Sequence, residues 1–324
     1  MKLFRNIAKT VVASACLLHI GAAQSAEWIM TSGYPEDNFH TKNIQMFIDE
    51  VEANTSVNIA LNSNDSLIKL NVIKTALQRG QVPIGEIRLG VYGNEDPMYT
   101  LSGLPFIAPD YESAWKLKEM QKPYFDALFA EAGLRILYYT PWPGQGFYTK
   151  FPVNSTEDFA DKKLRIYSTA TQQMGELLGF DATILPFAEI PQAFSTGLIE
   201  ALFTSPQTGI DIQAWDNTSD FTYAGAIFTK NAVVVNEKFF SALSAEDQAA
   251  ILAAATTAES RGWEMSEETT KAQLGILEEN GMTISDAPEQ VIEKMKEIGL
   301  VMIENWRADA SPEAEAVLDN FLGM

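Results

Sequence analysis

The sequence predicts an α/β fold in two domains, with largely parallel sheets. Segments typical of strands and helices alternate along the chain, which is the pattern that parallel sheets with helical crossovers produce. The length of 324 residues suits two domains of roughly 150 residues each. No linker rich in proline, glycine or serine separates the halves. We therefore expect several strands or helices to cross between the domains.

The first half opens on a short apolar strand and continues as strands and helices in turn. Residues 38–54 carry apolar side chains at helical spacing. Ser66 is a candidate N-cap for the following helix, which Gly80 ends. The expected elements are strands at 27–31, 57–61, 82–91 and 134–139 and helices at 38–54, 66–79 and 111–132.

The second half repeats this pattern with shorter elements. Residues 163–167 alternate apolar and polar side chains with a period of two, which is typical of a strand. Pro191 in the first turn and Gly197 beyond the end bound a short helix. The expected elements are strands at 163–167, 182–185 and 199–203 and helices at 171–178 and 189–196.

Residues 244–280 predict an unusually long helix. Ser244 with Asp247 resembles a capping arrangement, the segment contains no proline, and Gly281 follows it. A continuous helix over these residues would extend about 55 Å, which exceeds the diameter of one small domain. We expect a single helix that crosses both domains; the alternative is two helices broken at Gly262 or Gly275.

The N-terminus has the features of a secretion signal. Three basic residues lie within the first nine, and an apolar run at 11–23 is too short to span a bilayer. Small residues offer cleavage sites near Ala26, so residues 1–26 are the predicted signal peptide. A lipoprotein site at Cys16 is the alternative. We expect export to the periplasm with the signal removed.

Composition and charge exclude several classes of function. The formal net charge of −20 excludes a basic nucleic-acid interface. Beyond residue 26 the chain has no cysteine and a single histidine, His40, so a cysteine nucleophile, a thiolate zinc site and a multi-histidine metal site are excluded. A serine triad would need His40, and no Gly-x-Ser-x-Gly elbow is present. We predict neither enzyme activity nor a cofactor, and the sequence shows no set of metal ligands.

Several short segments, in order, resemble one family. The chain is similar to the solute-binding receptors of tripartite ATP-independent periplasmic (TRAP) transporters, the dicarboxylate-receptor-like family. Each segment alone is weak, whereas their order and spacing together are specific. The matching segments are TALQRG at 75–80, GLPF at 103–106, Asn154-Ser155 with Asp158, KLR at 163–165, PFAE at 186–189, GLIEA at 197–201, VVVN at 233–236 and the long helix from Ser244.

The resemblance implies a two-domain periplasmic binding protein fold with an interdomain cleft and a long helix spanning both domains. We predict that domain I comprises residues 27–142 plus 231–262 and domain II residues 143–230 plus 263–324. The implied function is capture of a small organic anion by domain closure and delivery to TRAP membrane subunits. We expect a monomer. The alternatives are a receptor for a sensor or an ATP-driven importer, and a secreted α/β enzyme acting on an organic acid.

The resemblance makes Arg165 the residue that pairs with the ligand carboxylate. A guanidinium offers two parallel donors that match a carboxylate and stays charged when enclosed. Alternation along the strand places Leu164 and Ile166 on one face and Arg165 and Tyr167 on the other, so Tyr167 is a further candidate. Without the resemblance, Arg165 would be interpreted as a surface charge.

Five further candidates follow from the same resemblance. Phe187 corresponds to a ring that packs on the ligand, with a core phenylalanine as the alternative. Thr204 and Ser205 correspond to polar ligand contacts, with a strand-end turn as the alternative. Trp142 and Gln145 lie in the loop before the Arg165 strand. Some family members carry a second arginine where this chain has Gln145, which argues against a dicarboxylate or sugar acid.

Arg88 corresponds to a cleft-facing position and could supply a second positive charge; the alternative is a strand residue paired with Glu86 or another neighbour. His40 is interpreted as a surface residue near a helix N-terminus.

The expected cleft region is rich in aromatic rings, about half of which should pack in the cores. We therefore expect a monocarboxylate with an apolar or aromatic body. The rings are Trp142, Phe147, Tyr148, Tyr167, Phe187 and Trp215.

Overall fold

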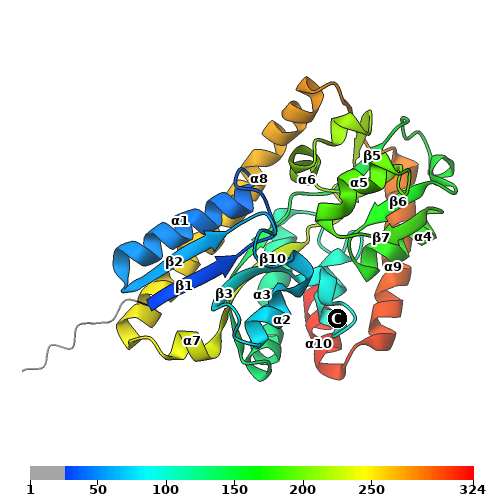
Figure 1. Ribbon diagram of the computed structural model, residues 1–324. Helices are drawn as coiled ribbons and strands as arrows, with labels where there is room; N and C mark the ends of the chain where they lie inside the picture. The colour runs from blue at the N-terminus through cyan, green and yellow to red at the C-terminus, as the bar shows by residue number, and fades with distance from the viewer. Residues whose placement is uncertain (1–25) are drawn as a thin grey trace, which may run out of the picture.

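The computed structural model describes residues 26–324, and residues 1–25 of the predicted signal peptide lie outside the described part. The described chain forms two sheets with helices packed on them (Figure 1). The two-domain α/β fold predicted from the sequence is confirmed. No helix of residues 26–324 is both long and apolar enough to cross a bilayer.

The first sheet has the strand order β2-β1-β3-β10-β4. β1 runs parallel to β2 and β3, whereas β10 runs antiparallel to β3 and β4. Its core contains the apolar faces of α1 and α8. The strands are β1 (Ala26–Thr31), β2 (Val57–Asn62), β3 (Ile84–Arg88), β4 (Leu134–Pro141) and β10 (Lys230–Asn236), and the helices beside them are α1 (Phe39–Asn54), α2 (Ile73–Gln78), α3 (Tyr111–Glu131) and α7 (Glu237–Ser241).

The second sheet has the order β11-β9-β5-β8-β6-β7. β6 pairs in parallel with β7 and β8, and β5 pairs antiparallel with β8 and β9. The strands are β5 (Gly146–Thr149), β6 (Lys163–Ile166), β7 (Asp181–Ile184), β8 (Ala201–Thr204), β9 (Asp220–Tyr223) and β11 (Thr283–Asp286), and the helices are α4 (Thr169–Leu177), α5 (Ile190–Ser195), α6 (Pro206–Asp211), α9 (Glu289–Asp309) and α10 (Pro312–Leu322).

Both sheets are more mixed than expected. The antiparallel strands are β5 and β10, and each follows the point where the chain passes from one sheet to the other, after β4 and after β9. A strand that enters directly from the neighbouring domain lacks the helical crossover that a parallel pair requires. The two direct crossings agree with the absence of a linker in the sequence.

The predicted helix at 66–79 is shorter than expected. A 3-10 turn at Leu70–Val72 precedes α2, which begins at Ile73. Asn64 and Asp65 both have positive φ, at 55° and 56°, and the Asp65 carboxylate accepts a hydrogen bond from Leu70 N at 2.8 Å. These contacts form a turn at 64–70, so Ser66 caps no helix. The remaining 3-10 turns are Leu89–Tyr92, Pro97–Gly103, Thr156–Phe159, Phe187–Glu189 and Ala214–Asp216.

The long helix is continuous. α8 (Ala245–Glu279) has 35 residues, and Ser244 caps it by accepting a hydrogen bond from Asp247 N. At 1.5 Å per residue it extends about 52 Å. It packs on α1 and β4 beside the first sheet and on α6 and β11 beside the second (Figure 1). The alternative of a break at Gly262 or Gly275 is wrong.

The two glycines within α8 have opposite surroundings, which gives a matched pair of stability predictions. A Cβ at Gly262 would lie 2.7 Å from both Asn43 Nδ2 and Thr140 Oγ1, whereas a Cβ at Gly275 would meet no atom within 4 Å. We expect Gly262→Ala to lower the free energy of unfolding by about 1–3 kcal/mol and Gly275→Ala to raise it by about 0.5–1 kcal/mol. Urea unfolding measures both, and equal stability of the two variants would contradict this account.

The C-terminal helices return toward the first sheet. α9 packs on α4 of the second domain, and α10 packs on α3 beside the first sheet. One apolar cluster extends across side chains near both sheets. The division into residues 27–142 plus 231–262 and 143–230 plus 263–324 stays a prediction, since the contact of α10 with α3 connects its last segment to domain I.

Candidate ligand-binding site

A small cavity lies between the two domains, at the ends of their strands. Arg88 ends β3, Thr204 ends β8, and Tyr167 directly follows β6. Strands of an open α/β sheet present their carboxyl ends at one edge, where ligands bind. All eight residues predicted from the sequence line this cavity, together with three that the sequence did not indicate. The lining residues are Tyr34, Arg88, Trp142, Gln145, Arg165, Tyr167, Phe187, Thr204, Ser205, Thr208 and Thr229.

Arg165 is buried within this site, with 1% of its surface exposed. Its Nε and Nη2 donate to Leu185 O at 3.1 and 2.9 Å, while its Nη1 bonds no described residue. Burial, assisted by repulsion from the Arg88 charge, lowers the pKa of Arg165 to about 9. Arg165 is therefore not a surface charge. It is an enclosed cation oriented by a main-chain carbonyl.

Arg88 contributes a second guanidinium to the same cavity. Its Nη2 donates to Tyr167 O at 3.2 Å, and its guanidinium carbon lies 5.0 Å from the centre of the Tyr167 ring. Its Nε is buried and has no hydrogen-bond partner among the described residues. Neither arginine forms an ion pair with a carboxylate of residues 26–324. The buried Arg165 and the partly buried Arg88 therefore place two positive charges at one cavity, and a charge removed from water requires a partner.

Neutral polar groups line the remaining walls. Tyr167 OH donates to Gln145 Oε1 at 2.6 Å, and Gln145 Nε2 donates to Thr229 Oγ1 at 3.2 Å. Ser205 caps α6, since its hydroxyl oxygen accepts from Thr208 N at 3.2 Å. Ser205 is thus both a strand-end turn residue and a cavity residue. These groups offer hydrogen bonds to a ligand without adding charge.

Three of the six aromatic rings expected near the cleft line the cavity, namely Trp142, Tyr167 and Phe187. Trp142 is held by its Nε1, which donates to Asn231 Oδ1 at 2.9 Å. Tyr34 packs edge-on against Trp142 and Phe187, with ring centres 5.0 and 5.8 Å apart. Tyr167 lies beside the two arginines. The other three rings pack in hydrophobic clusters: Phe147, Tyr148 and Trp215.

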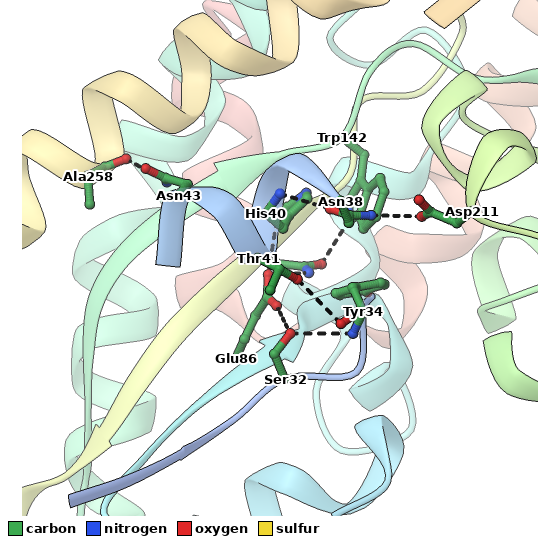
Figure 2. Close-up of polar contacts among 11 residues, drawn as sticks. Ser32, Tyr34, Asn38, His40, Thr41, Asn43, Glu86, Trp142, Asp211 and Ala258 are labelled. Carbon is green, nitrogen blue, oxygen red and sulfur yellow. Dashed lines mark hydrogen bonds and ion pairs between the residues drawn. The ribbon is translucent and has the colours of Figure 1, made fainter. Parts of the chain in front are cut away.

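His40 is not a surface residue, so that prediction is wrong. It is 1% exposed, its Nδ1 lies 2.9 Å from Glu86 Oε1, and its ring stacks on Trp142 with centres 4.2 Å apart (Figure 2). The first turn of α1 faces the cavity wall rather than solvent. The alternative in which Arg88 pairs with Glu86 is also wrong. The Glu86 carboxylate lies against His40, and Arg88 donates to Tyr167 O instead.

Glu86 connects this wall of the cavity into one buried network. Its Oε1 also accepts from Asn231 Nδ2 at 2.8 Å, and its Oε2 accepts from Ser32 Oγ at 2.6 Å. Because Asn231 holds the Trp142 indole, Glu86 fixes the orientation of a cavity ring that it does not touch. Within residues 26–324, no group of three or more histidine, cysteine, aspartate or glutamate side chains is arranged to hold a metal ion.

Two sheets joined by direct chain crossings, with a cavity lined by two arginines between them, are the architecture of a two-domain solute-binding receptor. The family model of bacterial extracellular solute-binding proteins, family 7 (DctP), matches residues 30–309. The chain belongs to this family, the receptors of TRAP transport systems, whose members bind small organic acids outside the cytoplasmic membrane. They are receptors and not enzymes, which sets aside the alternative of a secreted enzyme.

Two solved structures and a sequence relative agree with this assignment. DctP7 of Bordetella pertussis, an extracytoplasmic solute receptor binding pyroglutamic acid, is 36% identical with a TM-score of 0.89, over 91% of this chain and 99% of that chain. A marine metagenome TRAP solute-binding protein specific for pyroglutamate is 34% identical with a TM-score of 0.89, over 93% and 100%. The ectoine-binding periplasmic protein TeaA of Halomonas elongata is 22% identical over 99% of this chain and 96% of its own length.

Proposed function

We propose that this receptor binds a small monocarboxylate with a compact cyclic body, of the pyroglutamate type, and delivers it as a monomer to TRAP membrane subunits in the periplasm. The observation that carries the proposal is that two guanidinium groups, the buried Arg165 and the partly buried Arg88, line one cavity without a carboxylate partner among residues 26–324. The carboxylate would pair with Arg165 Nη1 and with the free donors of Arg88. Hydrogen bonds between a carboxylate and a guanidinium are stronger than those between neutral groups, and their geometry adds specificity.

The cavity walls support a ring-shaped body with polar edges. Trp142, Phe187 and Tyr34 offer aromatic faces, while Gln145 and Thr229 offer amide and hydroxyl groups. Gln145 adds no charge for a second carboxylate. Three receptors at 34–36% identity bind pyroglutamate, a monoacid whose ring carries one amide, and this supports the same class here.

Domain closure would enclose the ligand. The cavity takes Arg88 and Trp142 from one side and Arg165 and Phe187 from the other. Separation of the domains would open it to solvent, and a ligand that contacts both sides would favour the closed form by its higher affinity for that form.

A ligand screen tests the proposal. The protein without its signal peptide would be unfolded and refolded to release any bound ligand, then mixed with pyroglutamate, proline, ectoine, succinate, malate, glucuronate and aromatic acids. We expect pyroglutamate to stabilise it, by about 2.7 kcal/mol at 100 times the dissociation constant. Thermal shift and titration calorimetry measure this. Tight binding of succinate or malate without binding of any cyclic monoacid would overturn the proposal.

A further inference from the structure

The six-residue helix α6 connects the ligand cavity to the opposite domain. Ser205, its N-cap, and Thr208, in its first turn, line the cavity. Asp211, its last residue, accepts a hydrogen bond at Oδ2 from Asn38 Nδ2 at 2.7 Å (Figure 2). Asn38 precedes α1, which packs beside the first sheet. The contact therefore joins the two domains outside the cavity itself.

Both partners of this contact are oriented by further hydrogen bonds within their own domains. Asn38 is the N-cap of α1, and its Oδ1 accepts from His40 N at 2.8 Å, so its Nδ2 is the atom left to face Asp211. Asp211 Oδ1 accepts from Gln207 Nε2 at 2.6 Å, and Gln207 Oε1 accepts from Gln273 Nε2 of α8 at 2.9 Å. A hydrogen-bonded chain of three amides and the Asp211 carboxylate thus extends from the N-terminus of α1 through α6 to α8.

We propose that Asn38 and Asp211 form a latch that holds the two domains in the closed, ligand-bound form. Asp211 is then a determinant of ligand affinity that does not contact the ligand. The inference rests on the proposed binding of a small acid between the domains. Opening would separate Asn38 from Asp211 and expose the carboxyl group to water, whereas closing re-forms the hydrogen bond from Asn38 Nδ2 to Asp211 Oδ2.

The latch is expected to respond to pH. Asp211 forms no ion pair among the described residues, and burial raises its pKa to about 7, although the hydrogen bonds from Gln207 and Asn38 act in the opposite direction. Asp37 also raises the pKa, Lys42 lowers it, and the uncharged phenols of Tyr34 and Tyr148 are the other titratable groups close enough to interact with it.

The direction of the pH dependence of ligand affinity follows from proton uptake on closing. In the open form the carboxylate has the ordinary pKa of an aspartate near 4, so closing takes up a proton between about pH 4 and pH 7. Ligand affinity should therefore rise as the pH falls from 8 to 5.5, by at most tenfold per pH unit. Over this range Arg165, with a pKa of about 9, stays charged.

Two substitutions isolate the latch. Asn38→Ser keeps an N-cap oxygen for α1 but is too short to reach Asp211. We expect pyroglutamate to dissociate roughly tenfold faster from this variant. Asp211→Asn keeps one acceptor, and the Gln207 and Gln273 amides can rotate to pair with it because Gln273 Oε1 is buried without a partner. This variant should bind near wild-type affinity at pH 5.5 and lose the pH dependence.

Stopped-flow tryptophan fluorescence with pyroglutamate at pH 5.5 and 8 measures the dissociation rate, and small-angle scattering of the ligand-free protein measures its compactness. The control Asp216→Asn removes an exposed charge from the next turn and should behave as wild type. Equal rates and equal radii for the wild type, Asn38→Ser and Asp211→Asn at both pH values would overturn the latch. If the wild type binds no small acid, the proposed function fails, and the pH dependence of the scattering radius then decides the latch by itself.

Discussion

Arg165→Ala is expected to weaken ligand binding by about 2–5 kcal/mol, which corresponds to roughly 30- to several-thousand-fold in the dissociation constant. The reason is that the carboxylate would be enclosed with Arg88 alone, whose guanidinium is already engaged by Tyr167 O. Titration calorimetry with the acid found in the screen measures the loss. The free protein should remain folded, because Arg165 has no ion pair to lose within residues 26–324.

Two comparisons separate charge from geometry. Arg165→Lys keeps a cation but replaces the planar fork by a single point of donation, so it should bind with intermediate affinity. Arg135→Ala removes a half-exposed arginine paired with Glu237 and should leave affinity unchanged. Unaltered affinity of Arg165→Ala would remove this residue from the site.

Glu86→Ala is expected to produce the largest loss of stability, about 3–5 kcal/mol in the free energy of unfolding. The substitution removes the carboxylate that accepts from Ser32 Oγ and Asn231 Nδ2 and lies 2.9 Å from His40 Nδ1, and it leaves the two donors buried without this partner. Because Asn231 also orients Trp142, the variant should lose ligand affinity as well. Urea unfolding and calorimetry measure the two effects.

Glu86→Gln is the matched variant, because it keeps the shape and one acceptor oxygen while removing the charge. It should be destabilised less than Glu86→Ala. Glu36→Ala removes an exposed glutamate before α1 and should change stability by less than about 0.5 kcal/mol. A loss below about 1 kcal/mol for Glu86→Ala would show that the buried network contributes little.

The parts of the site that the sequence predicted are those encoded by local pattern. Period-two alternation put Arg165 and Tyr167 on one face of their strand, whereas Arg88 and Thr204, at the ends of β3 and β8 in different sheets, were indicated by the resemblance alone. The resemblance to TRAP receptors supplied their role. The α/β class and the long helix were predictable for the same reason, since alternation and the absence of proline are local signals.

The parts that were missed depend on tertiary placement. Tyr34 and His40 flank a turn whose residues are of the kind found on surfaces, and they are buried by packing against Trp142 and, for His40, against Glu86. Asp65 overrides the capping signal of Ser66 through its bond to Leu70 N, which no periodicity reveals. Thr229 reaches the cavity because β10 returns from the second sheet to the first, a topological fact that spacing alone does not contain.

The continuity of α8 limits how the receptor can move. A stiff helix packed on α1 and β4 at one end and on α6 and β11 at the other opposes sliding of one domain along the other and leaves rotation as the main degree of freedom. Under the proposed domain closure, each closing motion would bring Arg88 and Arg165 back to the same separation. The geometry of ligand recognition would therefore depend on the straightness of α8. A substitution that kinks α8 is expected to reduce discrimination between ligands before it abolishes binding.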